Sequence, residues 1–349
     1  MRLAFLGALA LVLIAVPVMA FHDGGVADCA GCHTMHNSED GVPVDPANLG
    51  GNPWLLRSST PSDVCLSCHA TRLGAVFNPD PLFAYTEYGG GNFQFLLEDN
   101  INDGHGGATD PIPGRAAGHN LDAPGAGAAP DGVLSTSPGG SFPAAVMGCT
   151  SCHDPHGTDS FRLLYGAGRS VQDGVAVFLN AAPTAEGLAI FGGGESPTSH
   201  TAYQGGMSGW CGNCHGNYHN NNADLVHPSG RAMGASIATT YGLYNGTVDQ
   251  LGGDPTLSYL PQVAFEDAAN TTTSTAGPSA SSQVSCISCH RAHATSAQDA
   301  GRWDFAVTYL HEDGVESGSL PIPDPYNNLN QRSLCNKCHN KDAFDANPF

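Results

Sequence analysis

Six copies of the pattern Cys-x-x-Cys-His contain all 12 cysteines of this 349-residue chain. Two thiols three positions apart can each form a thioether with one vinyl group of a single haem, and the adjacent imidazole then binds the iron. A disulfide framework or a set of zinc sites would not divide every cysteine into the same pentapeptide. A thioredoxin-like cysteine pair is disfavoured for the same reason. The sequence therefore predicts six covalently attached haem c groups.

Each motif assigns two attachment cysteines and one proximal iron ligand. The attachment residues are predicted to be Cys29, Cys32, Cys65, Cys68, Cys149, Cys152, Cys211, Cys214, Cys286, Cys289, Cys335 and Cys338. The proximal ligands are predicted to be His33, His69, His153, His215, His290 and His339.

Ten histidines lie outside the motifs, enough to supply a second axial ligand to every iron. His36, His156 and His293 each follow a proximal histidine by three residues, and His219 follows one by four. If the motifs are helical, these side chains lie on the next turn, and three residues of helix rise by only about 4.5 Å. That is too short for the chain to pass from one face of a porphyrin to the other. Each is therefore expected to bind the iron of a different haem, which brings neighbouring haems together.

Three further histidines compete for the two remaining axial places. His119 lies in a Gly-His-Asn sequence, His227 precedes a proline, and His22 lies close to the N-terminus. We predict that His119 and His227 are ligands and that His22 is the spare one. The predicted distal ligands are thus His36, His119, His156, His219, His227 and His293. The histidines in loop-like sequence, predicted to face solvent, are His105, His200 and His311.

The first twenty residues have the pattern of a secretory signal peptide. Arg2 precedes an apolar run from Leu3 to Val16, and Val18-Met19-Ala20 fits a cleavage site of small residues. We expect residues 1–20 to be removed and residues 21–349 to form a single exported hexahaem domain. No later stretch has the length and apolar character of a transmembrane segment.

The chain is strongly acidic, with 12 Lys and Arg against 32 Asp and Glu and a formal net charge of −20. Such a charge disfavours nucleic acid as a partner and repels negatively charged surfaces. A multihaem reductase of small oxyanions would need basic groups and an iron with an open coordination position. Basic residues are scarce here, and all six motifs end in histidine. We therefore expect no catalytic residues and an electron-transfer protein instead of an enzyme.

Glycine and proline are abundant, with 45 and 24 residues, which in other chains is typical of low complexity. Six large apolar macrocycles can replace much of a conventional core, so long loops become tolerable. The predicted fold is mostly loop with short helices and minimal strand, organised around a continuous chain of haems. Short helices are predicted at residues 145–153, 209–219 and 332–339, and a brief strand pair near residues 175–179.

The segments around the motifs resemble a known family. Residues 21–38, the sequence Gly118-His119-Asn120, the pair His227-Pro228 and residues 286–294 are similar to outer-surface, filament-forming hexahaem cytochromes of metal-reducing bacteria. The resemblance implies bis-histidine haems stacked in one continuous chain, in alternately parallel and T-shaped pairs. It also implies that His36 ligates a haem of the adjacent subunit. Other redox cytochromes and extracellular acceptors such as metal oxides are the implied partners.

Two forms of the protein stay open from the residues alone. A homopolymer would carry electrons at the outer cell surface, whereas a monomer would serve as a periplasmic shuttle or storage cytochrome. The size of the native particle distinguishes them. A multihaem oxyanion reductase is the third, less favoured possibility.

Overall fold

The computed structural model describes residues 28–71, 76–78, 89–98, 113–188, 195–219, 227, 229–315 and 320–340. Within these ranges most of the chain forms turns, bends and irregular loops, and helices and strands are short. The predicted fold class, mostly loop with short helices and little strand, is confirmed. The expected signal peptide and two of the histidines, His22 and His105, lie outside the described residues.

The regular elements in the described ranges are few. The α-helices are α1 (Cys29–Cys32), α2 (Pro61–His69), α3 (Met207–Cys211), α4 (Gly216–His219), α5 (Gly234–Leu243) and α6 (Cys286–Cys289). The strands form three antiparallel pairs: β1 (Ser38–Glu39) with β2 (Val42–Pro43), β3 (Ser170–Val171) with β4 (Ala176–Val177), and β5 (Thr184–Glu186) with β6 (Ala202–Gly205). The β3–β4 pair includes the predicted strand position near residues 175–179.

The helices at the motifs are shorter than predicted, and the continuous helices expected at three places are wrong. Residues 145–153 contain two separate 3₁₀ turns, and residues 209–219 are divided between α3 and α4. Residues 332–339 contain only the 3₁₀ helix η15 (Leu334–Lys337). In α1 and α6 the helix ends at the second cysteine, and His33 and His290 are extended, with ψ of 152° and 156°. The proximal imidazole thereby leaves the helix and reaches a carbonyl group elsewhere in the chain.

The largest apolar cluster joins α5 to the last two motifs. Tyr241, Tyr259 and Trp303 are nearly fully buried within it. Partly buried cysteines of those motifs, Cys289 and Cys335 among them, pack against its edge. A haem attached to these sulfur atoms would therefore extend an apolar surface that the protein already has.

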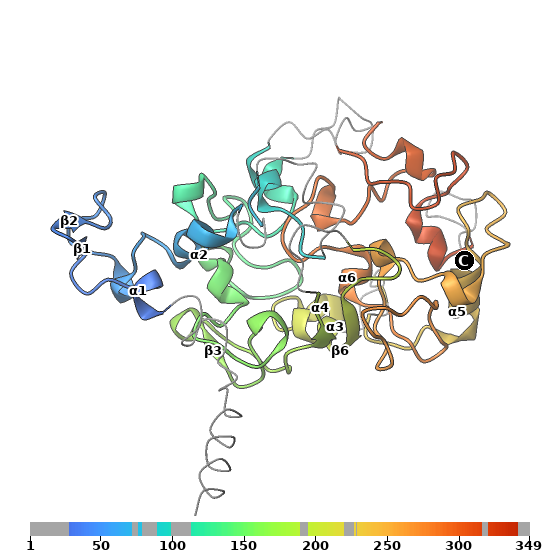
Figure 1. The fold of residues 1–349 in the computed structure, drawn as a ribbon, viewed down its shortest axis with the longest axis horizontal. Helices are drawn as coiled ribbons and strands as arrows, with labels where there is room; N and C mark the ends of the chain where they lie inside the picture. Colours follow the sequence, from blue (N-terminus) through green and yellow to red (C-terminus); the bar gives the residue numbers. More distant parts are fainter. Residues whose placement is uncertain are drawn as a thin grey trace, which may run out of the picture.

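The N-terminal described segment extends away from the rest of the molecule. Figure 1 shows α1, β1 and β2 projecting at one end of the long axis, with α5 at the other end. No helix in the described ranges has the length and apolar character needed to cross a membrane.

Candidate haem sites

The first, third and fifth motifs share one local structure. In each, the proximal histidine forms an antiparallel bridge with a residue of a later turn: His33 with Leu56, His153 with Leu164, and His290 with Gly301. Two residues in the left-handed region precede each bridge partner, with φ between 53° and 59°, and none of the six is glycine. This conformation costs roughly 1–2 kcal/mol per residue. Its presence at three motifs indicates that the hydrogen bonds it allows are part of the site.

Those left-handed turns present a carbonyl group to the proximal imidazole. The Nδ1 atom of His33 donates to Trp54 O at 2.9 Å, that of His153 to Arg162 O at 2.8 Å, and that of His290 to Asp299 O at 2.8 Å. His215, in the fourth motif, donates in the same way to Pro138 O at 2.7 Å. Donation from Nδ1 fixes the ring orientation and leaves the Nε2 lone pair available for a metal.

His119 has this arrangement without belonging to any motif. Its Nδ1 donates to Ala292 O at 2.8 Å. Burial lowers the pKa of His119 to about 4, and burial lowers the pKa of His293 to about 3. Both imidazoles are therefore neutral near pH 7, which is the form that binds a metal ion.

Three predicted distal histidines lie opposite proximal ones. The ring centroids are 6.3 Å apart for His33 and His156, 5.8 Å for His119 and His215, and 6.2 Å for His227 and His339. A metal–imidazole bond is about 2 Å, so two imidazoles that share one metal have ring centres roughly 6 Å apart. The donor set and its spacing thus fit a six-coordinate iron at the first, fourth and sixth motifs.

The remaining predicted distal ligands are placed less completely. His293 lies near enough to His153 to affect its own titration electrostatically, and its ring stacks on Phe93 at 4.4 Å. His36 is exposed on the projecting segment. The side chain of His219 lies outside the described residues.

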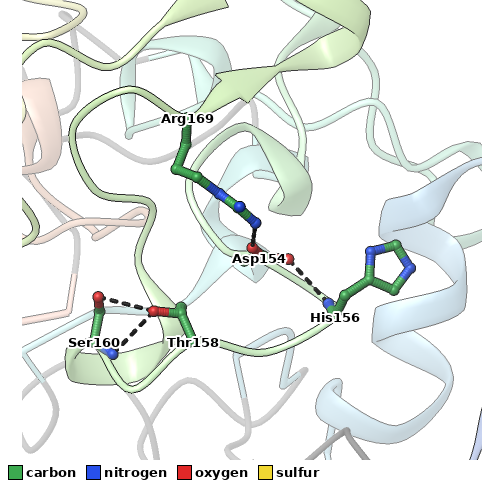
Figure 2. A network of polar contacts seen from close by, with 5 residues as sticks. All are labelled: Asp154, His156, Thr158, Ser160 and Arg169. Carbon is green, nitrogen blue, oxygen red and sulfur yellow. Dashed lines mark hydrogen bonds and ion pairs between the residues drawn. The ribbon is translucent and has the colours of Figure 1, made fainter.

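A polar network holds the loop that carries His156 (Figure 2). The Asp154 carboxylate accepts a hydrogen bond from the main-chain N–H of His156 at 3.0 Å, and it forms an ion pair with Arg169. Figure 2 shows the imidazole of His156 pointing away from this carboxylate. The network therefore fixes the backbone of His156 and leaves its ring free for a ligand.

Neighbouring motifs meet at two equivalent junctions. Ser62 Oγ accepts from the N–H of Cys149, and Ser208 Oγ accepts from the N–H of Cys286, both at 3.2 Å. Each serine precedes the first cysteine of an even-numbered motif by three residues. The second and third motifs, and likewise the fourth and fifth, thus bring their haem attachment points side by side.

The prediction that His200 faces solvent is wrong. Its side chain is 0% exposed and stacks on Tyr259 with 3.8 Å between ring centroids. Both ring nitrogens lie against carbonyl oxygens, Nδ1 at 3.0 Å from Thr201 O and Nε2 at 2.8 Å from Ser274 O. Both nitrogens are thus occupied inside the protein, and a neutral imidazole donates to one of these two carbonyls at a time. The prediction that His311 is exposed is confirmed.

Sequence reasoning missed the groups that orient the imidazoles. The carbonyl acceptors of His153 and His290 each follow the histidine by nine residues, at Arg162 and Asp299. That shared spacing was visible in the sequence, but main-chain carbonyls belong to every residue type. The two junction serines share a spacing that could also have been found.

The chain is similar to c-type cytochromes over almost its whole length. A family model described as a doubled CXXCH motif matches residues 142–176. The c-type cytochrome OmcS of Geobacter sulfurreducens is 31% identical over 423 residues, which cover 96% of this chain and 97% of OmcS. A cryo-electron microscopy structure of the OmcS nanowires from this bacterium has a TM-score of 0.75 at 28% identity, covering 92% of this chain and 100% of that one. A structure of its outer membrane cytochrome S filament has a TM-score of 0.71 at 29% identity, with the same coverage.

Proposed function

This chain belongs to the OmcS family of c-type cytochromes, and on that premise we propose that it carries electrons outside the cell as the subunit of a polymeric filament. When bound, the six haem c groups supply one-electron transfer between ferrous and ferric iron. The observation that carries the proposal is the set of histidine pairs spaced for iron, each drawn from different parts of the chain. They support electron transfer through irons that have a histidine on each side.

The protein's contribution is to hold twelve imidazoles in place. We assign attachment to the twelve motif cysteines and proximal ligation to the six motif histidines. His156 is assigned to the iron of His33, His293 to that of His153, His119 to that of His215, and His227 to that of His339. The carbonyl partners at Nδ1 orient the rings of His33, His119, His153, His215 and His290.

Chain order supports a ligand shared between subunits. His156 follows the third motif and faces the first, and His293 follows the fifth motif and lies near the third. By the same relation, the ligand opposite His290 of the fifth motif should be a histidine that follows another odd-numbered motif. In the described part of the chain no histidine ring faces His290 at the spacing of the other pairs. We infer that His36 of an adjacent subunit binds there.

The segment that carries His36 has the surface expected of a subunit contact. It projects from the molecule (Figure 1), and Met35 is 75% exposed although it is apolar. The other exposed large apolar side chains of this segment are Val42, Leu49, Trp54 and Leu55. Clustered apolar exposure of this kind marks a protein contact.

One axial position, opposite His69 at the second motif, still has no assigned ligand. His219 was predicted to be a distal ligand without an assigned iron, and His22 was left as the spare histidine. His119 is assigned to the fourth motif and lies before the third motif in the chain, and His227 is assigned to the sixth and lies before the fifth. By the same order, the ligand for the second motif should lie before the first motif, which favours His22. With either residue the six irons have twelve histidine ligands.

We place the mature protein, residues 21–349, at the outer cell surface after removal of residues 1–20. Its partners are further copies of itself, other redox cytochromes, and external acceptors such as metal oxides. A negatively charged surface repels the acidic chain as a whole. Contact with such an acceptor therefore has to occur through a limited part of the protein surface.

The polymer is tested with a His36→Ala variant and a His311→Ala control, purified with haem and examined by size under non-denaturing conditions. Unmodified protein and the control are expected to form long particles. The His36→Ala variant is expected to remain a single haem-loaded subunit. A variant that still polymerises would overturn the role of His36, and an unmodified protein that stays monomeric would favour a soluble carrier.

A further inference from the structure

Two of the three buried cations at the fifth and sixth motifs are Arg302 and Lys337, and the third is Arg291, which follows His290. The side chain of Arg302 is 3% exposed, and Lys337 is 0% exposed. In the described part of the chain neither forms an ion pair with a carboxylate. The protein has only 12 Lys and Arg, so the burial of Arg302 and Lys337 at these motifs is selective.

Arg302 is bonded to the fifth motif itself. Its Nε donates to Ile287 O at 2.6 Å and to His290 O at 3.3 Å, and its Nη1 donates to Pro261 O at 3.1 Å. Its Nη2 is buried without a hydrogen-bond partner among the described residues. The guanidinium group is charged at every accessible pH. A permanent, uncompensated charge therefore lies against the peptide that carries two cysteines and one ligand.

Lys337 lies between the two cysteines of the sixth motif in the sequence, and its ammonium group occupies an aromatic cage. Its Nζ donates to Tyr241 O, Ser258 O and Tyr326 Oη at 3.0, 3.1 and 2.9 Å. It lies 4.0 Å from the ring centroid of Tyr241, 5.5 Å from that of Tyr244 and 5.6 Å from that of Tyr326. The three oxygen acceptors and the ring faces favour the ammonium form of Lys337.

The equivalent positions at the earlier motifs lack a buried, unpaired positive charge. The main-chain N–H of Arg302 donates to the carbonyl of the second cysteine of its motif, and Arg57 and Tyr165 occupy the same place at the first and third motifs. Arg57 is half-exposed and paired with Glu39 at 2.8 Å, and Tyr165 is uncharged. Ser67 and Asn213 stand where the sixth motif has Lys337.

We propose that Arg302 and Lys337 give the haems of the fifth and sixth motifs a higher reduction potential than the haem of the first motif. A buried positive charge stabilises the reduced state, whose iron carries one positive charge less, and salt screens a buried charge only weakly. This inference rests on the proposed electron-transfer function. Each subunit would then hold its electrons preferentially at the C-terminal end.

Potentiometric titration of the haem-loaded protein, followed by electron paramagnetic resonance, can resolve individual irons. The imidazole planes of His33 and His156 are 11° apart, whereas those of His227 and His339 are 63° apart. Near-parallel imidazoles give a rhombic low-spin signal, and strongly tilted ones give a signal with a large g value. In unmodified protein the large-g signal of the most tilted pair, at the sixth motif, should disappear at a higher potential than the rhombic signal of the first.

The variants are Lys337→Gln and Arg302→Gln, with charge-keeping Lys337→Arg and Arg302→Lys. Each Gln variant is expected to lower the reduction potential of the haem at its own motif by at least 59 mV. For one electron, this equals a tenfold change in the oxidised-to-reduced ratio at a given potential. The charge-keeping variants should retain most of the unmodified potential. Arg57→Gln, the matched control at the first motif, should have a smaller effect because Glu39 already compensates that charge.

Low-spin spectra with six haems confirm that a variant keeps its ligands, so a failed potential shift is distinct from a failure of the proposed function. Unchanged high potentials in correctly loaded Gln variants would overturn the inference. So would a first-motif haem that reduces before the sixth in unmodified protein, a test that holds even if a variant does not fold.

Discussion

The imidazole of His156 lies nearly parallel to that of His33, with 6.3 Å between ring centroids, although the two residues belong to the third and first motifs. We infer that the first and third motifs are linked crosswise, because the loop that leaves the third site brings an imidazole to the first. Shared sites of this kind would help to hold chain segments that carry so little secondary structure.

Replacing His156 by alanine is expected to change one iron out of six. The His33 iron should lose its distal ligand and become high spin, while the thioether bonds of Cys29 and Cys32 keep its haem attached. Absorption and magnetic circular dichroism of the purified variant measure the high-spin fraction. The exposed His311→Ala variant is the control. A fully low-spin His156→Ala protein would show that this pair does not share an iron.

Gly118→Ala should disturb two predicted ligands at once. A Cβ atom at this position would lie 2.1 Å from His293 O, which also accepts a hydrogen bond from the N–H of His119. Overpacking of this kind typically costs 1–3 kcal/mol, here expected at about 2 kcal/mol or more because backbone atoms must move. Urea unfolding followed by haem absorption measures the cost. Gly132→Ala is the matched control, since nothing lies within 4 Å of its Cβ, and an equal loss in both variants would refute the prediction.

Acid should destabilise the fold, because two imidazoles that are neutral in the folded chain become protonated when it unfolds. The pKa of His119 is lowered to about 4 and that of His293 to about 3, against about 6.5 in an unfolded chain. Below pH 6.5 the unfolded chain binds protons that the folded chain excludes, so the free energy of unfolding falls as the pH falls.

Denaturant titrations at several pH values check this dependence. The free energy of unfolding should decrease steadily as the pH falls below 6.5. A free energy that stays constant down to about pH 4.5 would contradict the role of these neutral imidazoles.

Much of the haem chemistry was readable from residue types and spacing alone. The motifs and the histidines at fixed offsets follow from the chemistry of thioethers and iron. The helical geometry assumed for His156 and His293 was wrong, because the chain becomes extended at the proximal histidine. The pairing partners were not readable, since His33 and His156 meet only through tertiary structure. Likewise, burial of His200 depends on carbonyl groups at Thr201 and Ser274 that any sequence would offer.

The most direct test is cryo-electron microscopy of the haem-loaded protein at a resolution that shows axial ligands. We predict filaments in which His36 of one subunit is bound to the iron of His290 in the next, with His156 and His33 on a common iron within each subunit. The same map identifies which of His22 and His219 is bound opposite His69. Discrete particles with His36 on an iron of its own chain would contradict the filament and make the protein a soluble electron carrier.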